Sequence, residues 1–334
     1  MKTITLKAVF QYSLSLLLAV GLFVYVYGNR DLSQLFTTGQ NISWEWIGLS
    51  LFVANLSHLS RALRWRVALS PLGYRASAGG AYIAVMVGYL ANLVVPRMGE
   101  FSRCAVFQRS DKVPFTVSFG AVVAERVVDL LFLVLVIFIT LLLEFERVGG
   151  FITAQFSAQA GALQQKLLIA LGLLVVLGVI LGAVYRFRER LEQLALFRKG
   201  FSFLRGIRDG LLSIRKMPLR LRLQYVLYSF TIWFLYFLMT YVLFPALPAT
   251  TGLGVSAGFV VLMMGSLGMV MPVQAGIGFY HLFVSVGVAS FGVLREDAED
   301  FAFLIHSSQV AGIVIMGGIS LLINLFRQRQ DSQA

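Results

Sequence analysis

Long apolar runs separated by short polar or basic segments dominate the chain. Six of these runs have the length that a single helix needs to cross a membrane, about 20 residues. They lie at about residues 6–27, 44–63, 115–143, 167–185, 224–243 and 301–326. The pattern predicts an all-α polytopic membrane protein in which these runs form about six full spans.

Two further apolar stretches, 79–107 and 252–291, are interrupted by proline and glycine. Proline removes a backbone donor and glycine weakens a helix, so each stretch should break into two half-helices. The first stretch has basic residues on both flanks, and the second is followed by four acidic residues between 296 and 300. We therefore expect two re-entrant hairpins, the first entering from the cytoplasm and the second from outside. The helix-breaking residues are Pro96 and Gly99 in the first stretch, and Pro272, Gly276 and Gly278 in the second.

The order of span, hairpin and span occurs twice, at 44–143 and at 224–326, with opposite predicted orientation. Residues 1–43 supply the first span and a loop, and 144–222 connect the two repeats, so that 1–334 form a single transmembrane domain. Paired broken segments in corresponding halves indicate the substrate site of a transporter, where the breaks meet near the midplane. Two independent kinks in ordinary spans are the alternative to an inverted repeat.

The distribution of basic residues along the chain agrees with the predicted membrane orientation. The net charge of +12 does not require nucleic acid as a partner, because cytoplasmic loops of membrane proteins are enriched in Lys and Arg. Counted by segment, most basic residues lie in segments predicted to face the cytoplasm, including the four from Arg61 to Arg75. Both termini are therefore expected in the cytoplasm. Segment 186–222 has eleven Lys or Arg against three acids and apolar residues at helical spacing, which predicts interfacial helices contacting anionic lipid headgroups.

Charged residues at membrane depth cost free energy and are by default functional candidates. Two interpretations stay open. The arginines either neutralise the carboxylates, or one remains partly unpaired and binds a phosphate, with Arg97 and Arg103 as the leading candidates. The charged residues concerned are Arg97, Glu100 and Arg103 at spacing i, i+3 and i+6, and Glu125, Arg126 and Asp129 in the following span.

Polar residues near the breaks complete the candidate site: Asn92, Gln274 and His281. Proton coupling through Glu100 or His281 is conceivable. By contrast, Asn55 with His58, and His306 with Gln309, are expected to form interhelical hydrogen bonds, and the single cysteine, Cys104, to be a packed small residue. The chain has no motif of metal ligands, and we expect no cofactor.

Three motifs carry a family resemblance: Asn92-x-x-x-Pro-x-x-Gly-Glu-x-x-Arg103, Glu125-Arg-x-x-Asp129 and Pro272-x-x-Ala-Gly-Ile-Gly278. With them the chain resembles the lysylphosphatidylglycerol synthase transmembrane-region, or flippase-like, family. The resemblance implies an integral membrane protein of bacterial type that moves or handles lipids. Two departures are Ala275 in place of the first glycine of a Gly-Gly-Ile-Gly motif, and His281 near a position where the family often has Glu. The soluble aminoacyl-transferase domain of the synthases is not present, so lipid lysylation cannot be assigned.

The sequence therefore favours a flippase that moves an anionic phospholipid or lipid-linked substrate across the inner membrane of a bacterium. One alternative is an intramembrane enzyme acting on a lipid headgroup with Glu100 or Glu125 as base, but no nucleophile–base arrangement or nucleotide loop supports it. Another is a non-transporting subunit that recruits an envelope-pathway partner through 186–222. Homo-oligomerisation is left open.

Overall fold

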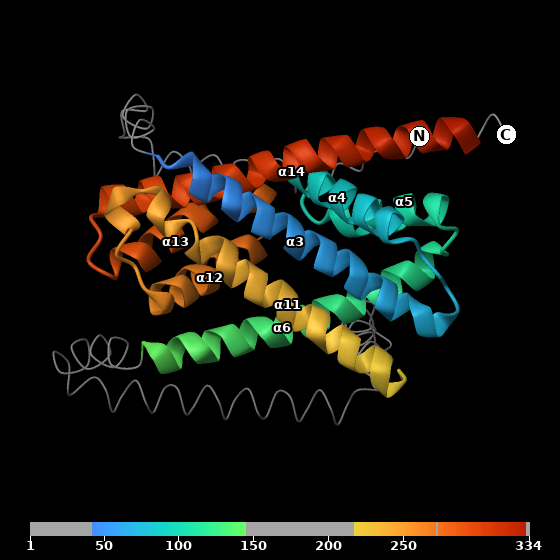
Figure 1. The fold of residues 1–334 in the computed structure, drawn as a ribbon, viewed down its shortest axis with the longest axis horizontal. Coiled ribbons are helices and arrows are strands. Elements are labelled where there is room, and N and C mark those ends of the chain that lie inside the picture. The colour runs from blue at the N-terminus through green and yellow to red at the C-terminus, as the bar shows by residue number, and fades with distance from the viewer. Residues whose placement is uncertain (1–41, 145–216, 272, 332–334) are drawn as a thin grey trace, which may run out of the picture.

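A computed structural model describes residues 42–144, 217–271 and 273–331 (Figure 1). The predicted spans at 6–27 and 167–185, most of segment 186–222, and Pro272 lie outside the described residues. Within the described ranges the regular elements are all helical. The first half comprises α3 (Trp44–Leu69), η2 (Ser70–Leu72), α4 (Ala78–Val94), α5 (Met98–Ser110) and α6 (Phe115–Leu143). The second half comprises α11 (Leu219–Tyr241), η3 (Phe244–Ala246), η4 (Pro248–Thr250), α12 (Val255–Val270), η5 (Gln274–Gly276), α13 (Phe279–Ala289) and α14 (Arg295–Asp331).

Three of the described helical segments are long and apolar enough to cross a membrane: Phe115–Leu143, Leu219–Ala246 and Arg295–Arg327. They coincide with three of the six predicted spans. The run predicted at 44–63 is also helical, but α3 continues to Leu69 and carries Arg61 and Arg64 in its second half. It therefore matches a membrane span in length and not in composition.

The last helix begins earlier than predicted. We expected the acidic residues between 296 and 300 to precede the final span, whereas α14 starts at Arg295 and contains them in its first turns. Acidic side chains at this end are favourable because the N-terminus of a helix carries partial positive charge.

Both predicted breaks are present in the described chain. Between α4 and α5 the chain turns within three residues, with Arg97 in a left-handed conformation (φ 64°). The two helices then fold back so closely that a Cβ atom on Gly88 would lie 2.9 Å from the carbonyl oxygen of Gly99. In the second half, a Cβ atom on Gly268 of α12 would lie 2.7 Å from the Cα atom of Tyr280 in α13. Small residues thus permit two tight helix hairpins.

The helix neighbours follow a two-fold pattern. Helices α3 and α11 pack against each other, α4 packs against α14, and α12 packs against α6. Exchanging each helix of the first half with its counterpart in the second leaves these pairings unchanged, as an internal repeat requires. In Figure 1 the α4–α5 hairpin occupies one end of the view and the α12–α13 hairpin the other. The second break meets the first hairpin, because η5 contacts α4.

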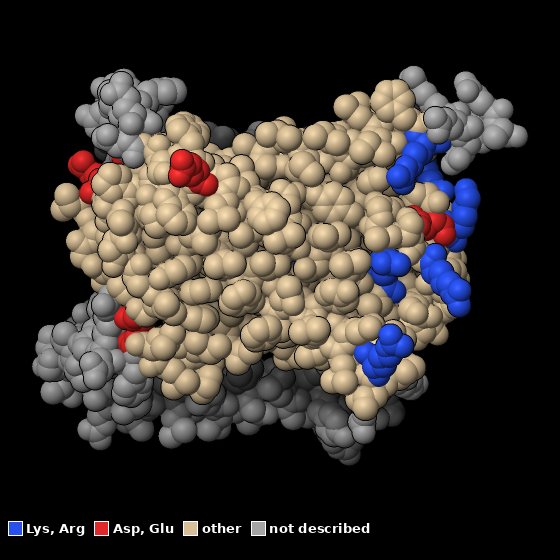
Figure 2. Space-filling model, viewed as in Figure 1, with Lys and Arg blue, Asp and Glu red and all other residues tan. Residues whose placement is uncertain are grey.

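The outer surface is mostly apolar. Lys and Arg gather at one end of the molecule in Figure 2, with one acidic group among them, and the other visible Asp and Glu lie at the opposite end. The surface between the two ends is uncharged in this view. Large apolar side chains such as Phe52, Leu131 and Ile315 are exposed. Such a surface suits contact with lipid.

Candidate functional site

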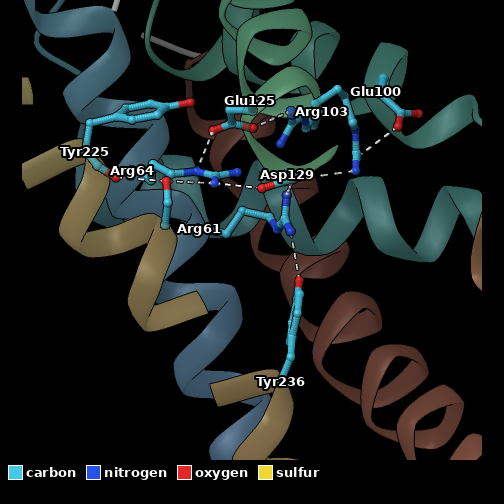
Figure 3. A network of polar contacts seen from close by, with 10 residues as sticks. Arg61, Arg64, Glu100, Arg103, Glu125, Asp129, Tyr225 and Tyr236 are labelled. Atoms are coloured by element: carbon cyan, nitrogen blue, oxygen red, sulfur yellow. Dashed lines mark hydrogen bonds and ion pairs between the residues drawn. The ribbon is translucent and has the colours of Figure 1, made fainter. Parts of the chain in front are cut away.

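A network of charged side chains joins α3 to α6 in the interior (Figure 3). Arg64 Nη1 lies 2.7 Å from Asp129 Oδ1, and Arg61 Nη1 lies 2.9 Å from Asp129 Oδ2. The two arginines are one turn apart on α3 and therefore share a face. Each carboxylate oxygen of Asp129 accepts a charge-assisted hydrogen bond from a different arginine.

Glu125 forms the deepest part of this network, and its side chain is fully buried. Its Oε2 atom accepts a hydrogen bond from Arg103 Nη2 at 2.8 Å, and its Oε1 atom lies 3.8 Å from Arg64 Nε. The Arg103 guanidinium also lies over the ring of Trp65, 4.8 Å from the centroid. Arg103 is thus held by both a carboxylate and an aromatic face, a combination for which a planar guanidinium is suited.

Helix α11 contributes uncharged partners to the same network. Arg61 Nη2 donates to the hydroxyl of Tyr236 at 2.8 Å, and Arg64 Nη1 donates to Ser229 Oγ at 3.1 Å. The Arg64 guanidinium lies over the ring of Tyr225, 5.5 Å from the centroid. Four helices, α3, α5, α6 and α11, are therefore tied together by one set of polar contacts. Buried charges are tolerated only when paired in this way.

The network reaches the surface at Arg126. Its Nη2 atom lies 2.9 Å from Glu100 Oε1, and its Nη1 atom lies 4.0 Å from Asp129 Oδ2. The Arg126 side chain is 48% exposed, whereas that of Glu100 is 21% exposed. With all groups ionised, the network has four arginines and three carboxylates. It therefore carries one excess positive charge, and its exposed end is a guanidinium.

Arg97 lies at the first break and differs from these arginines. It is exposed and forms no ion pair with any residue that the structure describes. Val94, Met98 and Phe101 around it are exposed as well. The break itself is held by Asn92, whose Oδ1 atom accepts a hydrogen bond from the backbone N–H of Gly99 at 2.6 Å. Asn92 thus has a structural role here, and Arg97 presents a cation on apolar surface.

The second break contains no charge and is organised by two histidines. Buried His281 accepts a hydrogen bond at Nδ1 from the backbone N–H of Gly278 at 3.3 Å. Its ring centroid lies 4.7 Å from that of His306, and His306 Nε2 lies 2.8 Å from the carbonyl oxygen of Ala275. Gln274 is half-buried in η5 of the same break. These polar groups stabilise the irregular backbone between α12 and α13.

The structure alters one expectation about location. We counted Arg61 and Arg64 with the cytoplasmic basic residues, and the structure buries both against α6 and α11. The reason is that α3 continues through them, which places them on the face that carries Ser57 and Ser60 toward the interior. Their i, i+3 spacing places them on one face of a helix but does not indicate that this face is buried. The partners Trp65, Ser229, Tyr225 and Tyr236 carried no comparable signal in the sequence.

Arg103 pairs with Glu125, and Arg126 lies near Asp129, as the neutralising interpretation expected of the arginines as a set. Arg97, which that interpretation also included, forms no ion pair among the described residues. Of the residues expected to bond between helices, Asn55 accepts a hydrogen bond from the hydroxyl of Tyr82 in α4. Cys104 is buried, as expected for a packed residue.

Comparison with known proteins identifies a family that the chain matches. A family model described as lysylphosphatidylglycerol synthase TM region matches residues 12–317. The UPF0104 membrane protein MJ1595 of Methanocaldococcus jannaschii is 25% identical over 132 residues, which are 39% of this chain and 38% of that protein. Glycosyltransferase AglD of Haloferax volcanii is 38% identical over 72 residues, 21% of this chain and 12% of that protein. The chain thus matches less than half the length of either relative. No solved structure matches it.

Proposed function

Because the chain belongs to the lysylphosphatidylglycerol synthase transmembrane-region family, we propose that it is a lipid flippase. In this proposal it moves an anionic phospholipid or lipid-linked substrate across the inner membrane of a bacterium. The observation that carries the proposal is Arg97, an exposed guanidinium at a helix break, surrounded by apolar surface and without an ion pair among the described residues. An always-charged planar donor group of this kind suits a phosphate.

Arg126 provides a second contact for the same anion. The Arg126 side chain is half-exposed, and among the described arginines Arg126 is the one that pairs with Glu100. The excess positive charge of the network makes its surface attractive to an anion. Arg103, one of the two leading candidates from the sequence, is less suited, because Glu125 and Trp65 already occupy its guanidinium. We therefore assign the phosphate to Arg97 and Arg126.

The two hairpins support a re-entrant arrangement. At 1.5 Å per residue, the 13 residues of α5 extend about 20 Å and the 11 residues of α13 about 16 Å. Both lengths fall short of the hydrocarbon core, about 30 Å. In our proposal each hairpin enters and leaves on one side, and the two repeats rock around the breaks where η5 meets α4. The basic end in Figure 2 is then cytoplasmic, which follows the positive-inside rule and suits cytoplasmic termini.

We favour transport over headgroup chemistry in the same site. A general base needs an available carboxylate, and Glu100, Glu125 and Asp129 each contact at least one arginine. The similarity to a glycosyltransferase covers a small part of that protein and does not alter this argument. Product formation from labelled phospholipid by the purified protein would favour the enzyme instead.

The test is a fluorescent-lipid accessibility assay in proteoliposomes. We expect protein-dependent flipping of an anionic lipid, strongly reduced by Arg97→Ala and partly retained by Arg97→Lys, which keeps the charge. The matched control is Arg109→Ala, which removes an exposed arginine at the other end of α5. Flipping at the intact rate in Arg97→Ala would contradict the assignment of the phosphate to this residue.

A further inference from the structure

Two buried histidines hold the second break, and both lie apart from the charged network. His281 and His306 are 2% and 5% exposed, and their ring centroids lie 4.7 Å apart. His306 Nε2 lies 2.8 Å from the carbonyl oxygen of Ala275, whose backbone is left-handed (φ 50°). Residues other than glycine seldom adopt this conformation, so contacts from the surrounding structure are needed to maintain it. His306 of α14 supplies one such contact.

His281 caps the helix that follows the break. It is the third residue of α13, and its Nδ1 atom accepts a hydrogen bond from the backbone N–H of Gly278 at 3.3 Å. In an ordinary capping box the side-chain oxygen of Glu or Gln accepts this bond. An imidazole accepts only at a nitrogen that carries no proton, so the bond requires neutral His281 with its proton on Nε2. Protonation of His281 at Nδ1 and the capping bond therefore exclude one another.

The surroundings of His281 also disfavour a positive charge while the break is closed. The N-terminus of α13 carries partial positive charge, and the titratable side chains of Tyr280 and His306 lie against His281. Helices α12 and α14 pack against α13. Neither α12 nor η5 contains a titratable side chain. The charged residues of α14 nearest to His306, at 295–300, precede it by at least six residues, about 9 Å along the helix.

We propose that His281 is a proton-binding site that controls the second break. With His281 neutral, the break is closed and capped as in the structure. In an open break the imidazole meets water and can take up a proton, after which Nδ1 no longer accepts the bond from Gly278. Because the proton binds the open state better than the closed state, acidification shifts the population toward the open state. Glu100, the other residue considered for proton coupling, is already ion-paired with Arg126.

The position of the break gives this proton a use. Because η5 contacts α4 of the first hairpin, opening the second break alters a contact between the two hairpins. In the rocking mechanism proposed above, a proton on His281 is then the ion that drives the movement of the repeats, a consequence that rests on the proposed function. Proton binding at His281 does not depend on transport and can be measured without it.

Hydrogen–deuterium exchange of the full chain in detergent, read by mass spectrometry, tests the proposal. The range from about pH 8 to about pH 5 brackets the ordinary pKa of histidine, about 6.5. His281→Gln is the decisive variant, because Gln at this helix position keeps a capping acceptor and does not titrate. His58→Gln is the matched control, since it removes a histidine of α3. Comparing the proteins at the same pH cancels the dependence of chemical exchange on pH.

In the intact chain we expect acidification to speed exchange in segment 273–282 by about tenfold beyond the chemical effect, the size of one lost hydrogen bond. His58→Gln should show the same acceleration, and His281→Gln should not. Acceleration that persists in His281→Gln, or that is absent from the intact chain, would overturn the proposal.

The intact chain supplies a second comparison in case His281→Gln does not fold. Segment 92–103 contains the first break and no histidine. Its exchange, corrected for the chemical effect of pH, should therefore stay constant while that of 273–282 rises. Equal acceleration in both segments would show a general loosening of the protein in acid and would refute a proton site at His281. Absence of lipid flipping in proteoliposomes bears on the proposed function and leaves this measurement unchanged.

Discussion

Arg64 donates through Nη1 to Asp129 Oδ1 at 2.7 Å, and this bond ties α3 to α6 across 65 residues of sequence. Asp129 accepts a second bond from Arg61, so one carboxylate holds two buried cations. Removing one partner of a buried ion pair leaves the other partner desolvated and unpaired. The stability of the helix bundle should therefore depend strongly on Asp129.

Asp129→Asn should lower the free energy of unfolding by about 3–5 kcal/mol, because Arg61 and Arg64 would face a neutral amide. Thermal unfolding in detergent, followed by intrinsic fluorescence, measures the change. Glu296→Gln is the control, since Glu296 is an exposed carboxylate in the first turn of α14. If the two variants unfold at the same temperature, Asp129 does not hold the network together.

Arg103 and Glu125 should be energetically coupled. Arg103→Gln and Glu125→Gln should each destabilise the protein, and the double variant should lose less than the sum of the two. For directly bonded partners we expect a coupling energy of about 0.5–3 kcal/mol. The readout is the midpoint of denaturant unfolding for the four proteins of the cycle. Strict additivity would be inconsistent with the 2.8 Å bond between them.

The tight approach of α4 and α5 should make Gly88 intolerant of a side chain. Gly88→Ala would place a Cβ atom 2.9 Å from the carbonyl oxygen of Gly99, a backbone atom that cannot move aside without separating the helices. Gly79→Ala in the same helix meets nothing within 4 Å and should be neutral or stabilising by up to about 1 kcal/mol, the difference in helix propensity. The ratio of folded to aggregated protein after detergent extraction distinguishes the two. Equal yields would show that the hairpin tolerates a wider spacing.

The Arg126–Glu100 pair should matter more for anion binding than for stability. Because Arg126 is half-exposed, the pair should contribute at most about 1 kcal/mol to folding. Glu100→Gln removes the carboxylate and should raise the affinity for phosphatidic acid, whereas Arg126→Gln should lower it. Native mass spectrometry of the detergent-solubilised protein with phosphatidic acid and with phosphatidylcholine measures both. Changes of the same sign in the two variants would argue against an anion contact at Arg126.

Local properties of the chain were predictable. The apolar runs at 115–143, 224–243 and 301–326 became helices of membrane-spanning length, and both helix breaks lie where Pro and Gly occur in the sequence. These features depend on residues within one or two turns of each other. Neutralisation of the carboxylates by the arginines was one of the two interpretations that the sequence left open, but the specific pairing of Arg103 with Glu125 was not predicted.

The long-range contacts were not accessible. Arg61 and Arg64 look like ordinary basic residues at the end of a span, and their burial depends on α3 packing against both α6 and α11.

The sequence by itself determined that this is a helical membrane protein with two apolar stretches interrupted by proline and glycine, because apolarity, proline and glycine act locally on the chain. Only the tertiary structure decided which charges are satisfied and which are available. An ion pair depends on the distance between side chains of different helices, and that distance is set by packing across the whole bundle. Packing buried Arg103 beside Glu125 and left Arg97 exposed, although both arginines belong to one motif.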